Sequence, residues 1–168
     1  MVEHSFVLNK PTPIVYQRLR ILILDAPTNA NLHLYVNEMK EFGVAVLVRT
    51  CESNYNHNLV LENDISVRDL FFNDGDPPPP EVVTDWLLLV QKSIETNTAI
   101  AVHCVAGLGR APVLACIALV EYGMQPLDAI YFVRERRKGA INRRQLEYLK
   151  MYKKQRRRTA KCLGCSSM

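Results

Sequence analysis

Short apolar runs alternate with amphipathic segments along most of this chain, and each pattern predicts a different element. Residues 20–25, 44–49 and 99–102 are apolar runs of strand length, and residues 65–69 alternate as a half-buried strand does. Apolar residues then recur at intervals of three and four, which predicts a helix over residues 32–42 that Gly43 ends. The buried face of this helix is expected to carry Leu32, Tyr35, Val36, Met39 and Phe42.

Further helices are predicted over residues 81–97, 111–122 and 126–136, and a last one continues through Leu146, Leu149 and Tyr152. Trp86 lies on the apolar face of the first of these, which favours a place in the core. The order strand, helix, strand predicts parallel strands joined by right-handed crossovers. We therefore expect an α/β fold of three layers, α/β/α, around a central, mostly parallel sheet. Residues 13–155 are expected to form the domain, between an irregular N-terminus (1–12) and a basic tail (156–168).

The composition is that of a soluble protein of one domain, with 48% hydrophobic and 23% charged residues in a chain of 168. The net charge of +4 is concentrated between residues 150 and 161, which contain lysines and arginines but no acidic residue. Residues 1–10 lack the pattern of a signal peptide, and no apolar run approaches the ~20 residues of a membrane span. Five cysteines without a secretion signal are typical of reduced thiols in the cytosol.

Residues 99–121 predict a strand, a short loop and a long apolar helix in succession. The first N–H groups of a helix have no partner within it, and the helix dipole adds positive charge there, so this arrangement binds anions. Gly107 and Gly109 carry no Cβ and let the loop turn its amides inward around an oxyanion. The expected phosphate-binding residues are Val105, Ala106, Gly107, Leu108, Gly109 and Arg110.

Cys104 begins this loop and Arg110 ends it, so that a single curl of the chain brings both side chains to the same anion. The Arg110 guanidinium is a planar fork that can bind two phosphate oxygens. The positive field favours the thiolate of Cys104, which is then a nucleophile aimed at phosphorus. The alternative is a buried structural cysteine. A dinucleotide-binding loop fits poorly, because Pro112 stands where its third glycine belongs.

Residues 103–112, His-Cys-Val-Ala-Gly-Leu-Gly-Arg-Ala-Pro, resemble the phosphate loop of the phosphatases of regenerating liver, small dual-specificity-type protein tyrosine phosphatases. Residues 9–13, 27–30 and 47–51 resemble the same family, and the similarity extends from Pro11 to the last residue. It implies a cysteine-phosphatase fold and substrates that are phosphotyrosine proteins or phosphoinositides. Members of this family also bind magnesium-transport membrane proteins through the face that holds the active site.

Residues 70–80 are predicted to form a loop, because an Asp-Gly pair favours a turn and four successive prolines block regular pairing. Phosphoryl transfer needs a proton for the leaving oxygen, and a carboxylic acid on a mobile loop can supply it. The family resemblance implies that this acid is Asp74, just before Gly75. The loop departs from the family, since residues 70–71 are Leu-Phe instead of Trp-Pro and Asn73 replaces an aspartate. Asp76 is a rival acid. The alternative for both aspartates is a structural role, in which they only cap turns and the helix that follows.

Cys51 follows the strand at 44–49 as Cys104 follows the strand at 99–102. Because the carboxyl ends of parallel strands meet at one edge of a sheet, both thiols are expected there. The residues alone leave Cys51 open between a small buried hydrophobe and a redox partner, while the family resemblance implies a regulatory cysteine. The hypothesis is a reversible disulfide between Cys51 and Cys104 that protects the thiolate from irreversible oxidation.

Two features precede the last predicted helix. A basic cluster either meets an acidic substrate or is a solvated helix end; its members are Arg134, Arg136, Arg137 and Lys138. Residues 139–145 resemble the glutamine-bearing segment of the family, which implies that Gln145 positions the attacking water. The alternative for Gln145 is a polar residue on the surface of a helix.

The chain ends in Cys165-Ser-Ser-Met168, a C-a-a-X box whose methionine favours farnesylation, although its two serines are not aliphatic. One isoprenoid binds membranes only marginally, and the basic run upstream supplies a second signal for an anionic membrane surface. Cys162 is a candidate for palmitoylation. A nucleic-acid partner is disfavoured because no aromatic platform accompanies the basic run. We expect the protein in the cytoplasm and on the cytoplasmic face of plasma or endosomal membranes.

These residues together predict a two-step phosphatase that needs no metal or other cofactor. Cys104 attacks the phosphoryl group while Asp74 protonates the leaving oxygen, and water then hydrolyses the phosphocysteine. Ala111 stands where many cysteine phosphatases have Ser or Thr, and without that hydroxyl the second step is expected to be slow. The alternative function is a membrane-docked binding module in which Cys104 is a phosphorylation-sensitive contact. The oligomeric state is left open, a homo-oligomer included.

Overall fold

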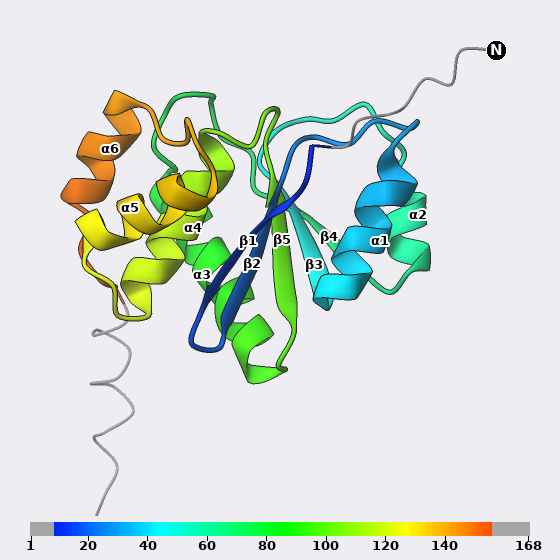
Figure 1. Ribbon diagram of the computed structural model, residues 1–168, viewed down its shortest axis with the longest axis horizontal. Helices are drawn as coiled ribbons and strands as arrows, with labels where there is room; N and C mark the ends of the chain where they lie inside the picture. The colour runs from blue at the N-terminus through cyan, green and yellow to red at the C-terminus, as the bar shows by residue number, and fades with distance from the viewer. Residues whose placement is uncertain (1–8, 156–168) are drawn as a thin grey trace, which may run out of the picture.

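A five-stranded sheet runs through the centre of the protein in the computed structural model, which describes residues 9–155 (Figure 1). The strand order is β1-β2-β5-β3-β4. The edge strand β1 (Thr12–Tyr16) is antiparallel to β2 (Leu19–Leu24), and β5 (Ala99–His103), β3 (Val44–Arg49) and β4 (Ser66–Asp69) continue the sheet in parallel. The mostly parallel sheet expected from the sequence is therefore confirmed.

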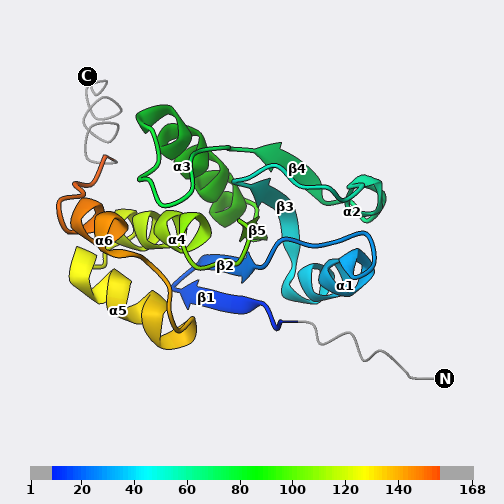
Figure 2. The ribbon, with the colours of Figure 1, turned by 90° about the horizontal axis from the view of Figure 1, so that it is seen from above.

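Helices cover both faces of the sheet, which makes the three layers that the sequence predicts (Figure 2). One face packs against α1 (Leu32–Phe42) and α2 (Asn58–Glu62). The other packs against α3 (Pro80–Glu95), α4 (Arg110–Glu121) and α5 (Pro126–Arg136), and α6 (Arg143–Lys150) packs against α4 and α5.

Alternate side chains of the central strand β5 serve the two cores. Ile100 and Val102 belong to the cluster on the α3–α6 side, and Ala99 and Ala101 belong to the cluster on the α1 side. All residues of α4 are buried, which explains why its sequence is apolar on every face instead of amphipathic. Trp86 is fully buried and donates from Nε1 to the Leu114 carbonyl at 2.8 Å, so its predicted place in the core is confirmed.

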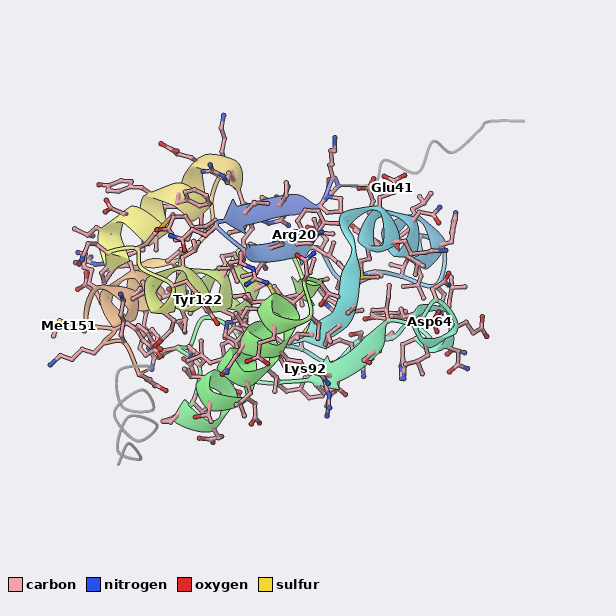
Figure 3. The ribbon with its side chains drawn as sticks, turned by 90° about the horizontal axis from the view of Figure 1, so that it is seen from below. Arg20, Glu41, Asp64, Lys92, Tyr122 and Met151 are labelled. Atoms are coloured by element: carbon pink, nitrogen blue, oxygen red, sulfur yellow. The ribbon has the colours of Figure 1, made fainter. Side chains whose placement is uncertain are left out.

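The helix ends match the expected signals. Helix α1 spans the predicted residues 32–42, and Gly43 caps it in the left-handed conformation with φ of +83°. Figure 3, which views the molecule from below, labels Arg20 of β2 and Glu41 near the end of α1. Arg20 of β2 donates to the Phe42 carbonyl at the end of α1, where a cation suits the helix dipole. Among residues 9–155, no helix has the length and hydropathy to cross a membrane.

Two elements were not predicted from the sequence, β1 and α2. The expectation that residues 1–12 are irregular is wrong at Thr12, which begins β1. Pro13 within that strand hides the pattern, but an edge strand tolerates proline because one side of its ladder is unpaired. Helix α2 has only five residues, too few to show a helical period.

Candidate active site

The loop at 104–109 leaves the carboxyl end of β5, between its neighbours β2 and β3, and leads directly into α4 (Figure 1). Cys104 is 3% exposed at the start of this loop, and Arg110 is 7% exposed at its end. This edge is where open α/β sheets place their sites. Cys104 thus lies at the predicted junction of strand and helix.

Every backbone carbonyl from Val105 to Gly109 accepts a hydrogen bond from a donor outside the stretch. The bonds are Ala26 N to Val105 O (2.9 Å), Arg137 Nη2 to Ala106 O (3.0 Å), Arg137 Nε to Gly107 O (2.6 Å), Ile141 N to Leu108 O (2.7 Å) and Val113 N to Gly109 O (3.1 Å). Across a trans peptide, the C=O of one residue and the N–H of the next point in opposite directions. The amides of residues 106–110 are therefore turned away from these donors, which forms a cradle for an anion.

Arg137 supports this cradle, and neither sequence interpretation of it was right. Its side chain is 10% exposed, and its guanidinium also donates to Thr12 Oγ1 (2.9 Å) and to the carboxylate of Asp25, so it is neither solvated nor free for a substrate. Arg134 is internal too, since it donates to the carbonyls of Ala140 (3.0 Å) and Ile141 (2.8 Å). The members of the basic cluster that remain exposed are Arg136 and Lys138.

Ile141 adopts a φ of +70°, which is unusual for a β-branched residue. Its N–H bonds to Leu108 O at 2.7 Å, and its own carbonyl accepts from Arg134 at 2.8 Å. The N–H of this strained residue thus ties the turn between α5 and α6 to the loop at 104–109, and its carbonyl ties the same turn to α5.

Arg110 and Asp74 meet beside this loop. The Arg110 Nη1 donates to Phe72 O at 3.1 Å, while its buried Nε has no hydrogen-bond partner among the described residues. Asp74 Oδ1 lies 3.7 Å from that Nε, and the Asp74 side chain is 82% exposed. Gly109 is close as well, since a Cβ built there would lie 3.8 Å from Asp74 Oδ1.

Asp76, the rival acid, is otherwise engaged. Its Oδ1 lies 2.6 Å from Arg144 Nη1, and its Oδ2 accepts from Asn73 Nδ2 at 3.4 Å. Between the two carboxyls of the loop, only Asp74 is recorded in contact with Arg110, so the geometry favours Asp74 as the group that faces a bound anion.

Gln145 is fully buried, so the alternative of a surface residue is wrong. It forms a capping box with Asn142, in which Gln145 Oε1 accepts from Asn142 N at 3.0 Å. Its Nε2 has no hydrogen-bond partner in the described part of the chain and would lie 3.2 Å from a Cβ at Gly109. A buried donor is thus left available beside the loop.

Cys51 lies two residues beyond Arg49, which pairs with His103 across β3 and β5, so both thiols follow neighbouring strand ends as expected. Cys51 and Cys104 are free thiols in this structure. Burial raises the pKa of Cys51, and the positive charge of Arg110 opposes that shift. Burial also raises the pKa of Cys116, which lies within α4 and donates weakly to Ala129 O.

His103 is fully buried and fixed by two hydrogen bonds. Its Nδ1 lies 3.1 Å from Cys104 O, which only accepts, so Nδ1 carries the proton and Nε2 accepts from the Tyr55 hydroxyl at 2.8 Å. Burial is the main cause that lowers the pKa of His103 to about 4 and raises the pKa of Tyr55 to about 12. Both groups are therefore neutral near pH 7.

The low pKa of His103 predicts a pH-dependent stability. An unfolded histidine titrates at about 6.5, so between that pH and about 4 the unfolded chain binds the extra proton. The free energy of unfolding should fall by about 2–3 kcal/mol as the pH drops from about 7 to about 4.5. His103→Gln, which keeps a donor and an acceptor without the charge, should remove this part of the decline in urea titrations. A variant with the unchanged pH slope would contradict the assignment.

Cys162 and Cys165, the predicted lipidation sites, lie outside the described residues, as does the basic tail from residue 156. Within the described part, Lys150, Lys153 and Lys154 are exposed where the chain leaves α6.

Known proteins with similar sequences are phosphatases. The family model described as "Polymorphic toxin system, DSP-PTPase phosphatase" matches residues 18–124. Protein tyrosine phosphatase type IVA 2 of Mus musculus is 47% identical over 150 residues, covering 87% of this chain and 90% of that protein. Protein tyrosine phosphatase type IVA 3 of Homo sapiens is 46% identical over 154 residues, covering 89% of each.

Solved structures agree. A putative protein tyrosine phosphatase from Leishmania major is 41% identical with a TM-score of 0.78, covering 86% of this chain and 99% of that one. PTPMT1, at 18% identity and a TM-score of 0.72, covers 92% of this chain and 99% of that one, and this likeness shows the fold alone.

Proposed function

The chain belongs to the protein tyrosine phosphatase type IVA family and is itself a protein tyrosine phosphatase, and we propose that it acts through a phosphocysteine on Cys104. The observation that carries this proposal is the set of carbonyls from Val105 to Gly109, each held from outside the loop. The amides opposite them, with Arg110, form a cradle for three phosphate oxygens beside the Cys104 sulfur.

In the first step, the Cys104 thiolate attacks phosphorus, a P–S bond forms and the P–O bond to the leaving group breaks. Asp74 gives its proton to the leaving oxygen, while the amides and Arg110 stabilise the charge on the other oxygens. In the second step, water attacks phosphorus, Asp74 takes the proton of the water and the thiolate leaves. Gln145 orients that water in this proposal, which its unpartnered Nε2 beside Gly109 supports.

Ala111 is expected to slow the second step. It is fully buried directly after Arg110 and offers no hydroxyl to the departing thiolate. The phosphocysteine should therefore accumulate during turnover.

Rapid quenching of the reaction with an aryl phosphate, followed by mass spectrometry, tests the proposal. We expect a phosphate adduct on the peptide that contains Cys104, in a burst of one equivalent followed by slow steady turnover. The adduct should persist in Cys51→Ser. An adduct elsewhere, or turnover without any adduct, would refute the proposed intermediate.

The same burst separates the alternative function. A stoichiometric burst without further turnover would favour the binding module, in which the unphosphorylated loop docks on a membrane protein such as a magnesium transporter. Turnover many times above the enzyme concentration favours the phosphatase.

Phosphoproteins are the substrates that the relatives imply, and the surface around the loop supports phosphotyrosine. Val105 and Leu108 of the loop are 63% and 39% exposed, and Phe71 of the acid-bearing loop is 43% exposed. Exposed apolar side chains at the cradle suit an aromatic ring better than the polar inositol ring of a phosphoinositide, the other substrate class considered. Higher kcat/KM on phosphoinositides than on phosphotyrosine peptides would reverse this preference.

Asp74 is expected to be the general acid. Asp74→Asn should lower kcat/KM for phenyl phosphate, which has a poor leaving group, by about 100-fold. Asp76→Asn should lower it by less than about 5-fold, because that carboxylate pairs with Arg144 on the surface. A larger loss in Asp76→Asn than in Asp74→Asn would exchange the two roles.

A reversible disulfide between Cys51 and Cys104 remains part of the proposal. Mild peroxide would convert the Cys104 thiolate to a sulfenic acid, and the Cys51 thiol would displace water from it to form the S–S bond. This step is supported by the positions of the two cysteines, which follow the paired ends of the neighbouring strands β3 and β5. Peptide mapping after oxidation should show the cross-link, and irreversible sulfinic acid in its place would refute the protection.

Membrane anchoring through the tail also remains a proposal, supported by the C-a-a-X box at Cys165 and the basic run before it. The farnesylated full chain should float with vesicles that contain anionic lipid, and less at high salt. Equal binding to neutral vesicles would refute the basic contribution.

A further inference from the structure

The acid-bearing loop touches the first turn of α6 through two contacts at its tip. Asp76 Oδ1 lies 2.6 Å from Arg144 Nη1, and Asn142 Nδ2 donates to Gly75 O at 3.3 Å. Gly75 and Asp76 directly follow Asp74 in the chain. The flanking residues Phe72 and Pro78 are buried, whereas Asp74 is 82% exposed, so the tip between them depends on such surface contacts.

The first turn of α6 is itself fixed to the phosphate loop. Ile141 bonds to Leu108 O at 2.7 Å, and Gln145 is buried against Gly109. Asn142 joins the acid-bearing loop to α6, because its Oδ1 caps α6 by accepting from Gln145 N at 2.8 Å while its Nδ2 donates to the Gly75 carbonyl. The contacts of Gly75 and Asp76 therefore set the position of the loop tip relative to Cys104 and Arg110.

We propose that the Asp76–Arg144 ion pair and the Gly75–Asn142 hydrogen bond are a latch that holds Asp74 over the phosphate loop. Asp76, Arg144 and Asn142 are positioning residues, since none of them is required to touch the substrate. This inference rests on the proposed function of Asp74 as the general acid. It gives Asp76 a role that differs from that of a second acid.

The latch is weak and reversible. The side chains of Arg144 and Asp76 are 71% and 34% exposed, and a surface ion pair of this kind shifts an equilibrium by only about two- to five-fold. Charge reversal adds repulsion to the loss of the pair. We therefore expect a partial opening of the loop, which lowers proton donation without disturbing the cradle.

The experiment compares two substrates, phenyl phosphate and a fluorinated coumarin phosphate whose leaving group needs little protonation. The kcat/KM for phenyl phosphate divided by the kcat/KM for the coumarin phosphate reports on proton donation by the acid. Changes in phosphate binding affect both values and cancel in this ratio. Arg144→Glu should lower this ratio by about 5-fold, and it places an acid in the first turn of α6, which the helix dipole favours. Exchanging the charges, with Asp76→Arg and Arg144→Asp together, should restore the ratio to within about 2-fold.

Arg143→Glu is the matched control. Arg143 is the neighbouring residue in the same turn, is exposed, and forms no side-chain hydrogen bond or ion pair within residues 9–155. Arg143→Glu makes the same change of charge near an anionic substrate as Arg144→Glu does. It should therefore change kcat/KM alike for both substrates and leave the ratio within about 2-fold.

Equal ratios in the Arg144 and Arg143 variants, or a charge exchange that does not restore the ratio, would overturn the latch.

The ratio measured in Asp74→Asn shows whether the latch alone is wrong or whether the proposed role of Asp74 as the general acid is wrong as well. If Asp74→Asn lowers the ratio and Arg144→Glu does not, only the latch is wrong. If Asp74→Asn leaves the ratio unchanged, the acid assignment fails and the latch fails with it.

Discussion

Cys104→Ser is expected to lower kcat by at least about 10⁴-fold while inorganic phosphate still binds with nearly unchanged affinity. The two effects separate because the cradle is built from backbone amides and Arg110, which do not involve the sulfur. A serine hydroxyl remains protonated near pH 7 and is a far poorer nucleophile than a cysteine sulfur. Initial rates on an aryl phosphate and calorimetry with phosphate measure the two quantities.

Cys116→Ala is the matched control for this prediction. Cys116 is a buried thiol of the helix that follows the loop, and it contacts Ala129 O instead of the cradle. Its removal should leave kcat within about 3-fold. Residual turnover above about 1% in Cys104→Ser would assign the nucleophile elsewhere. Loss of phosphate affinity together with turnover would show that the thiol shapes the loop.

Hydrophobic periodicity was sufficient to predict the layers of the fold, because each helix and buried strand keeps the same pattern of buried and exposed faces from end to end. The helix at 111–122 shows this, since its run without polar positions predicts full burial, and all residues of α4 are buried. The edge strand β1 was missed because Pro13 removes a donor that only an interior strand needs. The short helix α2 carries too few residues for any period.

The candidate site was predictable where its residues are close in sequence. Cys104, the glycines and Arg110 lie within one loop, so their spacing alone brings them to one anion. The supports of the loop were not predictable, because Ala26, Arg137 and Ile141 reach it from distant parts of the chain. One signal was available, since Asp25 directly follows a buried strand at the same sheet edge, and a largely buried carboxylate there favours a cation as its partner.

Arg137→Met is expected to lower kcat/KM by about 10³-fold, at the upper end of the about 10²–10³-fold loss caused by removing a single oxyanion donor. The Arg137 side chain is 10% exposed and donates to the carbonyls of both Ala106 and Gly107. Without it, these peptides can rotate, and the amides on their other side leave the cradle. The effect should appear in the affinity for phosphate as well as in kcat, which distinguishes it from the loss of the nucleophile.

The same substitution should destabilise the fold by about 3 kcal/mol, because it leaves the Asp25 carboxylate, 20% exposed, without its cation. Asn9 still donates to Asp25 at 2.6 Å, so the charge keeps one partner. Adding Asp25→Asn should recover part of this stability and none of the activity, since the carbonyls of the loop remain without donors. Urea unfolding and steady-state kinetics on the single and double variants separate the two roles.

Arg136→Met is the control for Arg137, since its guanidinium lies 3.4 Å from the Phe132 ring and its side chain is 40% exposed. It should change kcat/KM by less than about 3-fold. Arg137→Lys should recover only a small part of the lost activity, because one ammonium cannot span two carbonyls and the Thr12 hydroxyl as the planar fork does. Full activity in Arg137→Lys would show that the charge alone is needed and that the amide cradle forms without the hydrogen bonds described above.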